Sequence, residues 1–463
     1  MDELSFLPAT EQARLVREGE VSPVELVETY LERIERLDPE LGAFVTVCAE
    51  QALADAREKA DAPAETPFHG VPIAFKDLDT TAGIRTTFSS KPFAENVPDF
   101  DLAHVARTRA AGFVVLGKTN TPEFGTTAFT DSPLNGPCRT PWDLGRNAGG
   151  SSGGAAAAVA AGLVPIAQGS DGGGSIRIPA SCCGLFGIKA SRGRVSNAPF
   201  VPGIGLGTAA PMARTTLDAA AYLDLVTGYE WGDPFPAAPP ERPYVEEIGV
   251  EPGRLRIAFT TEALIETPVE PACVAAARDA AELLASLGHD VEEAAPDWGG
   301  EELMEDFLPV WQAIPALYPI ADPTELSVLN QWYLERALVT TSPVYAGAIG
   351  RLQLRARRIV SFWADYDLLL TPTLALPPVP LGWDTEPDDP REQFDRAAAF
   401  TPFTAVFNVT GQPAVSLPLH WTDDGLPIGV QLVGPPLGEA LLFRVSSQLE
   451  AARPWLARRP PHA

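Results

Sequence analysis

Apolar side chains recur every three or four positions between residues 22 and 38, which is the spacing of one face of an α-helix. Ser22, Pro23 and Glu25 form its predicted start, because serine caps a first turn, proline fits its first position and glutamate completes a capping box. The sequence Leu37-Asp38-Pro39 predicts its end. We therefore expect residues 1–60 to be helical.

Short apolar runs between loops predict buried strands further along the chain, and they alternate with helical stretches. This alternation indicates an α/β architecture in which helices cover a sheet on both faces. The predicted strands are residues 71–75, 113–116, 163–167, 255–259, 368–370, 414–417 and 428–432. The predicted helices include residues 216–226, 272–287 and 344–363.

Two proline-rich stretches interrupt this pattern. Residues 231–243 are the best candidate for a linker, although a surface excursion fits the same composition. Residues 377–390 are also acidic, and we expect a long exposed loop of the kind that often borders a pocket.

Composition and charge narrow the classes of function. With 45% hydrophobic and 21% charged residues, the chain of 463 residues can bury a large core, so neither disorder nor a fibrous protein fits. The 34 basic and 61 acidic residues give a net charge of -27, and the resulting field repels polyphosphates and anionic lipids. Binding to nucleic acid or to a membrane surface is therefore not expected.

Location and redox state are predicted from the same composition. An uncharged run, residues 155–168, is shorter than the roughly 20 apolar residues of a membrane helix and is interrupted by Gly162 and Pro165. The acidic start lacks an apolar leader, so we expect a soluble, cytoplasmic protein. The five cysteines lack metal-like spacing and predict reduced, mostly buried thiols. For the adjacent Cys182 and Cys183, we prefer core packing to redox control.

Residues 112–119 match the phosphate-loop pattern of two glycines followed by Lys118 and Thr119. In a phosphate loop the intervening backbone must wrap a phosphate, but Phe-Val-Val-Leu is typical of a buried strand. No helix is indicated at Lys118, because residues 120–122 predict a turn. We therefore prefer a core strand to a nucleotide site.

Two segments, residues 149–154 and 169–179, are rich in glycine and serine. Dense glycines let another group approach backbone N–H donors closely. A flexible linker would be longer and more polar, and a phosphate site would need a following Lys-Ser/Thr pair. The segments instead favour backbone stabilisation of the oxyanion that forms when a carbonyl is attacked.

Attack on a carbonyl requires a nucleophile and a base, and no histidine has a favourable sequence context. A neutral lysine can serve as the base beside a serine. Lys76 ends the apolar stretch 70–75, whose burial would favour the uncharged amine. Asp77 should point to the opposite face if the strand continues. A structural Lys76 that pairs with a distant carboxylate remains an open alternative.

Several motifs occur together in an order that resembles the amidase signature family. They are residues 70–77, 116–120, 149–154, 171–179, 183–189, 411–414 and 425–431, so the resemblance covers nearly the whole chain. It implies a large, mixed, twisted β-sheet with helices on both faces. It also implies a single domain, residues 1–463, comprising a helical segment 1–66, a catalytic core 67–230, a variable substrate-pocket segment 231–410 and closing strands with a helix 411–463.

Carried over residue by residue, the resemblance makes Ser175 the nucleophile, Ser151 a bridging serine on a cis peptide, and Lys76 the base. It places the oxyanion donors in the backbone of Gly172, Gly173, Gly174 and Ser175 itself. Supporting positions are Ser152, Asp171 and Arg177. It implies no metal and no organic cofactor. Gly172 is smaller than the residue of many members, which predicts a roomier acyl site.

Pocket residues are predicted less directly. Thr126, Thr127 and Phe129 are expected to line the pocket. Aromatic residues of the variable segment are further candidates, although in helices such side chains are more often core. These are Trp311, Tyr318, Trp332 and Tyr333.

The expected function is hydrolysis of C–N bonds in small, largely apolar amides, anilides or carbamates (urethanes) through an acyl-enzyme on Ser175. The alternative is a glutamine-hydrolysing amidotransferase subunit that works with protein partners on charged tRNA and needs an arginine for the glutamine carboxylate. A noncatalytic binding module is disfavoured, because all three chemical residues are present. The expected partner is a small-molecule substrate, without nucleic acid or membrane, and a homodimer is left open.

Overall fold

The computed structural model describes residues 2–200 and 205–463. Its first long helix, α3 (Pro23–Leu41), starts as the sequence predicts. The Ser22 hydroxyl accepts the Glu25 N–H at 3.1 Å, and the Glu25 carboxylate accepts the Ser22 N–H at 2.8 Å. This reciprocal capping box fixes where the helix begins.

The predicted end of α3 at residues 37–39 is wrong, because the helix continues through Pro39 to Leu41. The chain leaves the helix only at Gly42, whose φ of +65° glycine adopts without steric cost. The Asp38 carboxylate then accepts the N–H of Ala43 at 2.7 Å. A proline in the last turn is therefore tolerated where the following residues supply a complete helix end.

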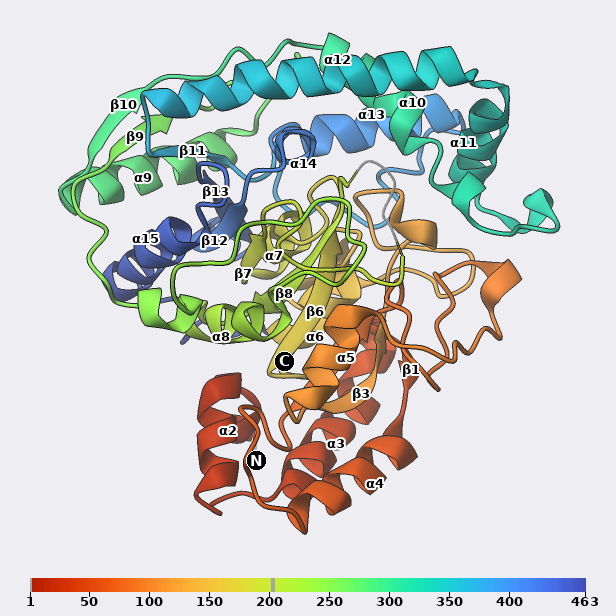
Figure 1. The fold of residues 1–463 in the computed structure, drawn as a ribbon, viewed down its shortest axis with the longest axis vertical. Coiled ribbons are helices and arrows are strands. Elements are labelled where there is room, and N and C mark those ends of the chain that lie inside the picture. The colour runs from red at the N-terminus through yellow and green to blue at the C-terminus, as the bar shows by residue number, and fades with distance from the viewer. Residues whose placement is uncertain (1, 201–204) are drawn as a thin grey trace.

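Eleven strands form one mixed sheet in the described part of the chain (Figure 1), which confirms the predicted fold class. Strands β2, β3 and β6 are parallel, whereas most pairs in the middle of the sheet are antiparallel. In spatial order the strands are β1 (Phe44–Val47), β3 (Val114–Thr119), β2 (Pro72–Lys76), β6 (Ile166–Asp171), β8 (Thr208–Ala213), β7 (Phe186–Lys189), β12 (Ala414–Trp421), β13 (Pro427–Val433), β11 (Leu368–Pro372), β9 (Arg256–Phe259) and β10 (Asp290–Glu293).

Each predicted strand corresponds to a strand of this sheet, although the one predicted at 163–167 lies at 166–171. Strands β1, β7, β8 and β10 were not predicted, and β1 interrupts the all-helical start expected for residues 1–60. A separate two-stranded sheet joins β4 (Arg139–Thr140) to β5 (Asp143–Asn147).

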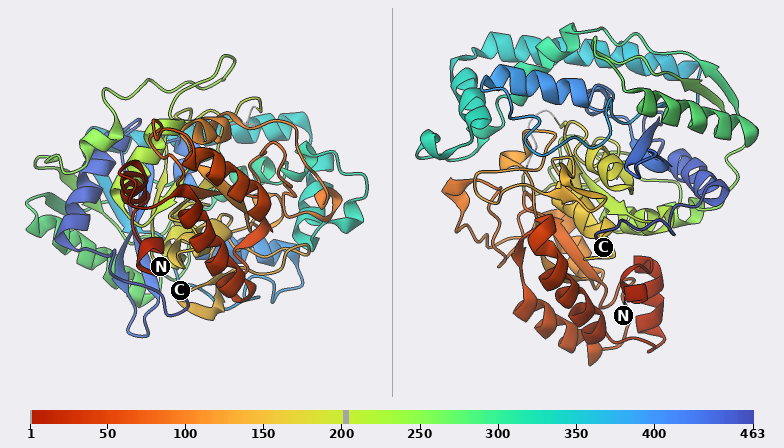
Figure 2. Two further views of the ribbon diagram at one scale, coloured as in Figure 1. Left: turned by 90° about the horizontal axis from the view of Figure 1, so that it is seen from below. Right: turned by 180° about the vertical axis from the view of Figure 1, so that it is seen from behind.

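Helices pack on both faces of the sheet (Figures 1 and 2). Besides α3, the N-terminal part contains α1 (Asp2–Ser5), α2 (Ala9–Arg17), α4 (Ala49–Ala60) and α5 (Ala103–Ala110). The central part contains α6 (Gly153–Ala160), α7 (Arg177–Cys183), α8 (Thr216–Val226) and α9 (Pro271–Ser286). The remainder are α10 (Glu302–Trp311), α11 (Val328–Val339), α12 (Ser342–Ser361), α13 (Pro390–Phe400), α14 (Val406–Thr410) and α15 (Glu439–Ala452). Thus α8, α9 and α12 confirm the predicted helices.

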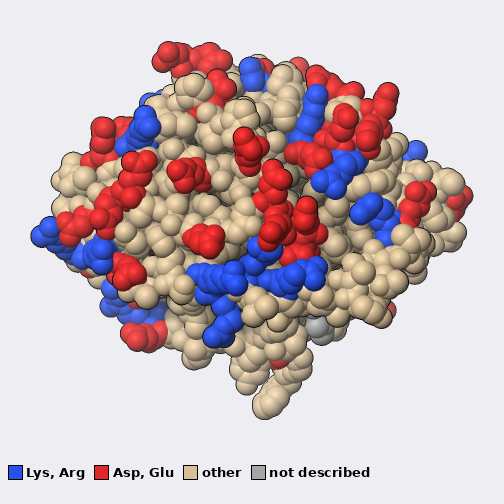
Figure 3. Space-filling model, turned by 90° about the horizontal axis from the view of Figure 1, so that it is seen from above, with Lys and Arg blue, Asp and Glu red and all other residues tan. Residues whose placement is uncertain are grey.

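Two apolar clusters form most of the core. The larger cluster runs from the N-terminal helices through the central strands, whereas the second joins α10, α12 and α14 to the far half of the sheet. In Figure 1 these three helices lie together at the top of the molecule. The surface seen from above carries many acidic side chains, with a row of basic side chains near its centre (Figure 3).

The two ambiguous segments have clear conformations. Residues 231–243 are an irregular surface excursion, since the strands before and after them belong to the same sheet. The segment that matches the phosphate-loop pattern contains strand β3, so the predicted core strand is confirmed. Lys118 is buried in this strand. Its Nζ donates to the Asp79 carbonyl and to the hydroxyls of Thr81 and Thr86 at 3.0 Å each.

Among the described residues, no helix has the length and apolar content needed to cross a membrane. All five cysteines are free thiols, and all except the partly exposed Cys48 are buried. The cysteine prediction is therefore confirmed.

Candidate active site

The carboxyl ends of β2 and β6 bring the predicted groups together. These neighbouring strands are parallel, with Phe75 opposite Gln168, so Lys76 at the end of β2 lies beside the end of β6. Lys76 is fully buried, because β2 has a strand on each side, β3 and β6. The strand pairing therefore places an amine next to the loop that continues from β6.

The Lys76 amine contacts serine oxygens. Its Nζ lies 2.7 Å from Ser151 Oγ, 3.1 Å from Ser170 Oγ and 3.4 Å from the Ser170 carbonyl oxygen. Burial lowers the pKa of Lys76 to about 7, against the opposing charges of Asp79 and Asp171. Asp77 faces away, as predicted, and accepts the N–H groups of Thr87 and Ser89. The geometry thus favours the base over the alternative of a carboxylate-paired lysine.

A second buried lysine provides a comparison. Burial also lowers the pKa of Lys189 to about 7. Its Nζ, however, donates to the Ala190 carbonyl at 3.1 Å rather than contacting a serine hydroxyl. Of these two lysines, only Lys76 has both a lowered pKa and an amine in contact with serine hydroxyls.

Ser151 follows a cis peptide bond from Gly150, in agreement with the resemblance. A Cβ on Gly150 would lie 2.7 Å from the Phe129 nitrogen, so only glycine fits against that backbone. Ser152 holds the neighbouring loop: its N–H donates to the Ser175 carbonyl at 3.1 Å, and its Oγ donates to the Ser170 carbonyl at 3.1 Å.

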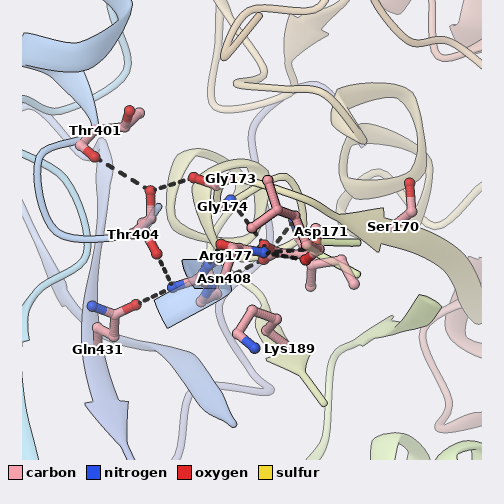
Figure 4. Close-up of polar contacts among 12 residues, drawn as sticks. Ser170, Asp171, Gly173, Gly174, Arg177, Lys189, Thr401, Thr404, Asn408 and Gln431 are labelled. Atoms are coloured by element: carbon pink, nitrogen blue, oxygen red, sulfur yellow. Dashed lines mark hydrogen bonds and ion pairs between the residues drawn. The ribbon is translucent and has the colours of Figure 1, made fainter. Parts of the chain in front are cut away.

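An ion pair supports the loop that carries Ser175 (Figure 4). Both oxygens of Asp171 receive hydrogen bonds from the Arg177 guanidinium at 2.9 Å, and both side chains are fully buried. Burial raises the pKa of Asp171, but the charge and hydrogen bonds of Arg177 outweigh this effect and lower the pKa below its ordinary value. The sequence predicted this pair as a support, and its position directly around residues 172–176 agrees with that role.

Residues far along the chain complete this support. Arg177 also donates to Asn408 Oδ1 and Gln431 Oε1, each at 2.7 Å, and the Thr404 hydroxyl donates to the Gly173 carbonyl at 2.7 Å. Sequence reasoning did not single out these three partners. Gln431 lies within the motif 425–431, whereas nothing in the local sequence marks Asn408 or Thr404.

The predicted oxyanion donors differ in their surroundings. Gly172, Gly173 and Ser175 line the cavities beside the site. Gly174 does not fit the predicted role, because its N–H already donates to Asp171 Oδ1 at 2.8 Å. Its φ of +128° directs this bond back toward the carboxylate, so Gly174 shapes the loop instead.

Two cavities meet at Ser175, whose side chain is almost buried at 6% exposure. The larger cavity has a volume of about 250 Å³ and is lined by Ser151, Ser170, Gly172 and apolar side chains that include Leu78, Phe124 and Leu317. The smaller one has a volume of about 60 Å³ and lies against Gly173, Thr126, Thr127 and the helices α10 and α13.

The residues that line the two cavities test the predictions made for the pocket. Thr126 and Thr127 line the smaller cavity, together with Tyr333. Phe129 was predicted wrongly: its buried ring stacks on Phe400 with the centroids 5.1 Å apart, and Ala128 faces the cavity instead. Trp311 lines both cavities, whereas Tyr318 and Trp332 line neither. Residues 377–390 line neither cavity, and Trp383 of this loop contacts Phe129 with the ring centroids 5.9 Å apart.

Comparisons with known proteins agree with this fold and site. A family model described as Amidase matches residues 25–311 and 317–443. A 6-aminohexanoate-cyclic-dimer hydrolase of Paenarthrobacter ureafaciens is 40% identical over 477 residues, which cover 98% of this chain and 96% of that protein. An acylamidase of Rhodococcus erythropolis is 35% identical over 474 residues, which cover 99% of this chain and 98% of that protein. A solved structure of 6-aminohexanoate cyclic dimer hydrolase complexed with substrate has a TM-score of 0.94 at 38% identity and matches 99% of both chains.

The fold and these relatives define the class of protein: it is a hydrolase that acts on the C–N bonds of amides. Since the family model covers most of the sequence, the chain belongs to the amidase family, the amidase signature enzymes. The resemblance seen in the motifs is thereby confirmed.

Proposed function

We propose that this amidase hydrolyses small, neutral, largely apolar amides, anilides or carbamates through an acyl-enzyme on Ser175. One observation carries the choice of substrate: no described residue that lines either cavity at Ser175 is Asp, Glu, Lys, Arg or His. Burying a charged substrate group without a partner costs several kcal/mol, roughly, so a neutral substrate fits best.

The first chemical step forms the acyl-enzyme. Neutral Lys76 accepts the proton of Ser151 as Ser151 accepts the proton of Ser175. The Ser175 oxygen adds to the carbonyl carbon, and the C=O electron pair moves onto oxygen. Backbone N–H groups of Gly172, Gly173 and Ser175 stabilise this oxyanion.

Collapse of the tetrahedral intermediate breaks the C–N bond. The proton held by Lys76 returns through Ser151 to the leaving nitrogen, so the amine departs neutral and the C=O bond reforms. Water then adds to the Ser175 ester with the same relay acting as the base. Collapse of this second tetrahedral intermediate breaks the bond to the Ser175 oxygen, releases the acid and restores the Ser175 hydroxyl.

The amidotransferase alternative is less well supported. A glutamine substrate carries a carboxylate that needs a cationic partner, and none of the described cavity residues supplies one. The relatives reported above, a cyclic-dimer hydrolase and an acylamidase, also favour amides other than glutamine.

Amine release from an anilide, an aryl carbamate and glutamine by the isolated protein tests this proposal. We expect turnover of the first two substrates, no turnover of glutamine, and a mass increase on Ser175 when the reaction is quenched early. Ser175→Ala should abolish turnover, Lys76→Ala should nearly do so, and Ser151→Ala should fall between. Undiminished activity of Ser175→Ala, or glutamine as the preferred substrate, would overturn the proposal.

A further inference from the structure

One tryptophan separates the two cavities at Ser175. Trp311 lines both, and its Nε1 donates to the Thr126 carbonyl at 2.9 Å. Its ring stacks on Phe307 with the centroids 5.1 Å apart. A Cβ on Gly173 would lie 3.5 Å from that ring, so the ring covers the loop that carries the nucleophile. Trp311 is therefore a fixed wall between two substrate arms.

The positions of the serines assign the two arms. Ser151 and Ser170 line only the larger cavity, and Gly173 lines only the smaller one. The leaving nitrogen must receive its proton from Ser151, so the amine arm extends into the larger cavity. The acyl arm, on the other side of the attacked carbon, then extends into the smaller cavity. Gly172 lines only the larger cavity, so this assignment does not support the roomier acyl site expected from Gly172.

The far end of the smaller cavity is formed by side chains that also line a neighbouring cavity. Met304, Phe394 and the small Ala398 line both this cavity and a third one of about 310 Å³ that lies beyond it. Met304, Phe307 and Trp311 follow one another at helical spacing along α10, so this helix forms the wall of the acyl arm from the nucleophile to its far end.

We propose that the smaller cavity receives the acyl chain and that Met304 and Phe394 set the chain length the enzyme accepts. This inference rests on the proposed acyl-enzyme mechanism. The cavity volume of about 60 Å³ is about a quarter of the 250 Å³ of the larger cavity, so the smaller cavity favours short acyl groups such as acetyl or propionyl. Longer chains must displace Met304 or Phe394 to reach the third cavity.

An acyl-length series measures this limit. The substrates are the acetyl, butyryl and hexanoyl amides of 4-nitroaniline, with uncharged chains because Glu266, Glu301 and Glu305 line the third cavity. The natural protein should lose kcat/KM steadily along the series. Met304→Ala should reverse the trend and raise the hexanoyl-to-acetyl ratio at least about tenfold, since each newly buried methylene is worth about fourfold. Phe394→Leu, on a different helix, should raise the ratio in the same direction and provides a second test if Met304→Ala fails to fold.

Matched variants locate the effect. Met304→Leu keeps the side-chain volume and should leave the ratio unchanged. Leu317→Ala alters the rim of the larger cavity and should change selectivity between a phenyl and a naphthyl amine without changing the acyl-length ratio.

The outcomes separate this inference from the proposed function. Turnover of the acetyl substrate with the same ratio in Met304→Ala and Phe394→Leu would overturn the inference and leave the acyl-enzyme mechanism standing. A shift of the acyl-length ratio in Leu317→Ala alone would reverse the assignment of the two arms. Absence of turnover, together with no acylation of Ser175, would overturn both proposals.

Discussion

A single buried amine governs the pH dependence expected of this enzyme. The pKa of Lys76 is lowered to about 7 by burial, and its ordinary value is 10.5. Only the neutral amine can accept a proton, so kcat/KM for a neutral anilide should rise about tenfold per pH unit below pH about 7 and level off above it. A pH-rate profile measures this directly, and a flat profile down to pH about 5 would contradict it.

Lys189 supplies the control for this profile, because burial lowers its pKa to about 7 as well. Lys189→Met removes that titration and leaves the contacts of Lys76 in place. We expect the midpoint of the profile to stay near 7 in this variant. If the midpoint disappeared in Lys189→Met, the titrating group would be Lys189 and the role proposed for Lys76 would be contradicted.

Two glycines of the same loop should respond differently to a methyl group. A Cβ on Gly172 would lie 3.6 Å from the Trp311 ring, which is ordinary contact, so Gly172→Ala should fold with little loss of stability. A Cβ on Gly174 would clash with Thr404 Oγ1 and lie 2.7 Å from Ile178 Cδ1, at a φ of +128°. Gly174→Ala should lower the free energy of unfolding by about 1–3 kcal/mol or more. Urea unfolding compares the pair, and equal losses would contradict the loop geometry.

Some strands could be predicted from the sequence, whereas others could not, because their local composition is not typical of a strand. The apolar runs of β2, β3 and β13 are sufficient to predict these strands, because consecutive residues in each of them are buried. β8 contains Pro211 and several alanines, and β10 is polar, so neither has the composition of a strand. β8 exists because it pairs with β6 on one side and β7 on the other. Strand pairing at long range therefore decides what local composition leaves open.

The candidate site divides in the same way. Lys76, Ser151 and Ser175 lie in local motifs, so they could be chosen from the sequence through the family resemblance. Met304 lies in a variable segment whose helix meets the site only through tertiary packing, and the sequence did not single it out. Trp311 of the same helix was a pocket candidate, but its helical spacing also fits a core position. The motifs therefore pointed to the candidate chemical groups and to some pocket residues, whereas the division of the pocket into two cavities was not predicted.

The junction between β6 and α7 depends on a buried ion pair, and its loss should be costly. Asp171→Asn leaves Arg177 buried without its charged partner, which should lower the free energy of unfolding by about 3–5 kcal/mol. The matched control is Asp290→Asn, because Asp290 pairs with Arg254 at the exposed edge of the sheet. That change should alter the stability little, because solvent and salt screen an exposed ion pair. Similar denaturation midpoints for the two variants would contradict the structural role of Asp171.

At the scale of the whole molecule, a net charge of -27 surrounds two cavities whose described linings carry no charged side chain. The field should slow the approach of an anionic substrate, and the site offers such a substrate no partner. We therefore expect a carboxylate-bearing anilide to have a much lower kcat/KM than its neutral analogue at low ionic strength. Raising the salt from about 0.01 M to about 1 M shortens the screening length from about 30 Å to about 3 Å.

Salt should consequently raise kcat/KM for the anionic anilide and change that of the neutral analogue little. Part of the deficit should persist at high salt, because screening acts outside the protein and leaves the uncharged cavity wall as it is. Steady-state kinetics of the matched substrate pair across this range separate the two contributions. If the anionic substrate were hydrolysed as fast as the neutral one at low salt, a cationic group would have to lie at the site. Such a result would return glutamine-like substrates to consideration.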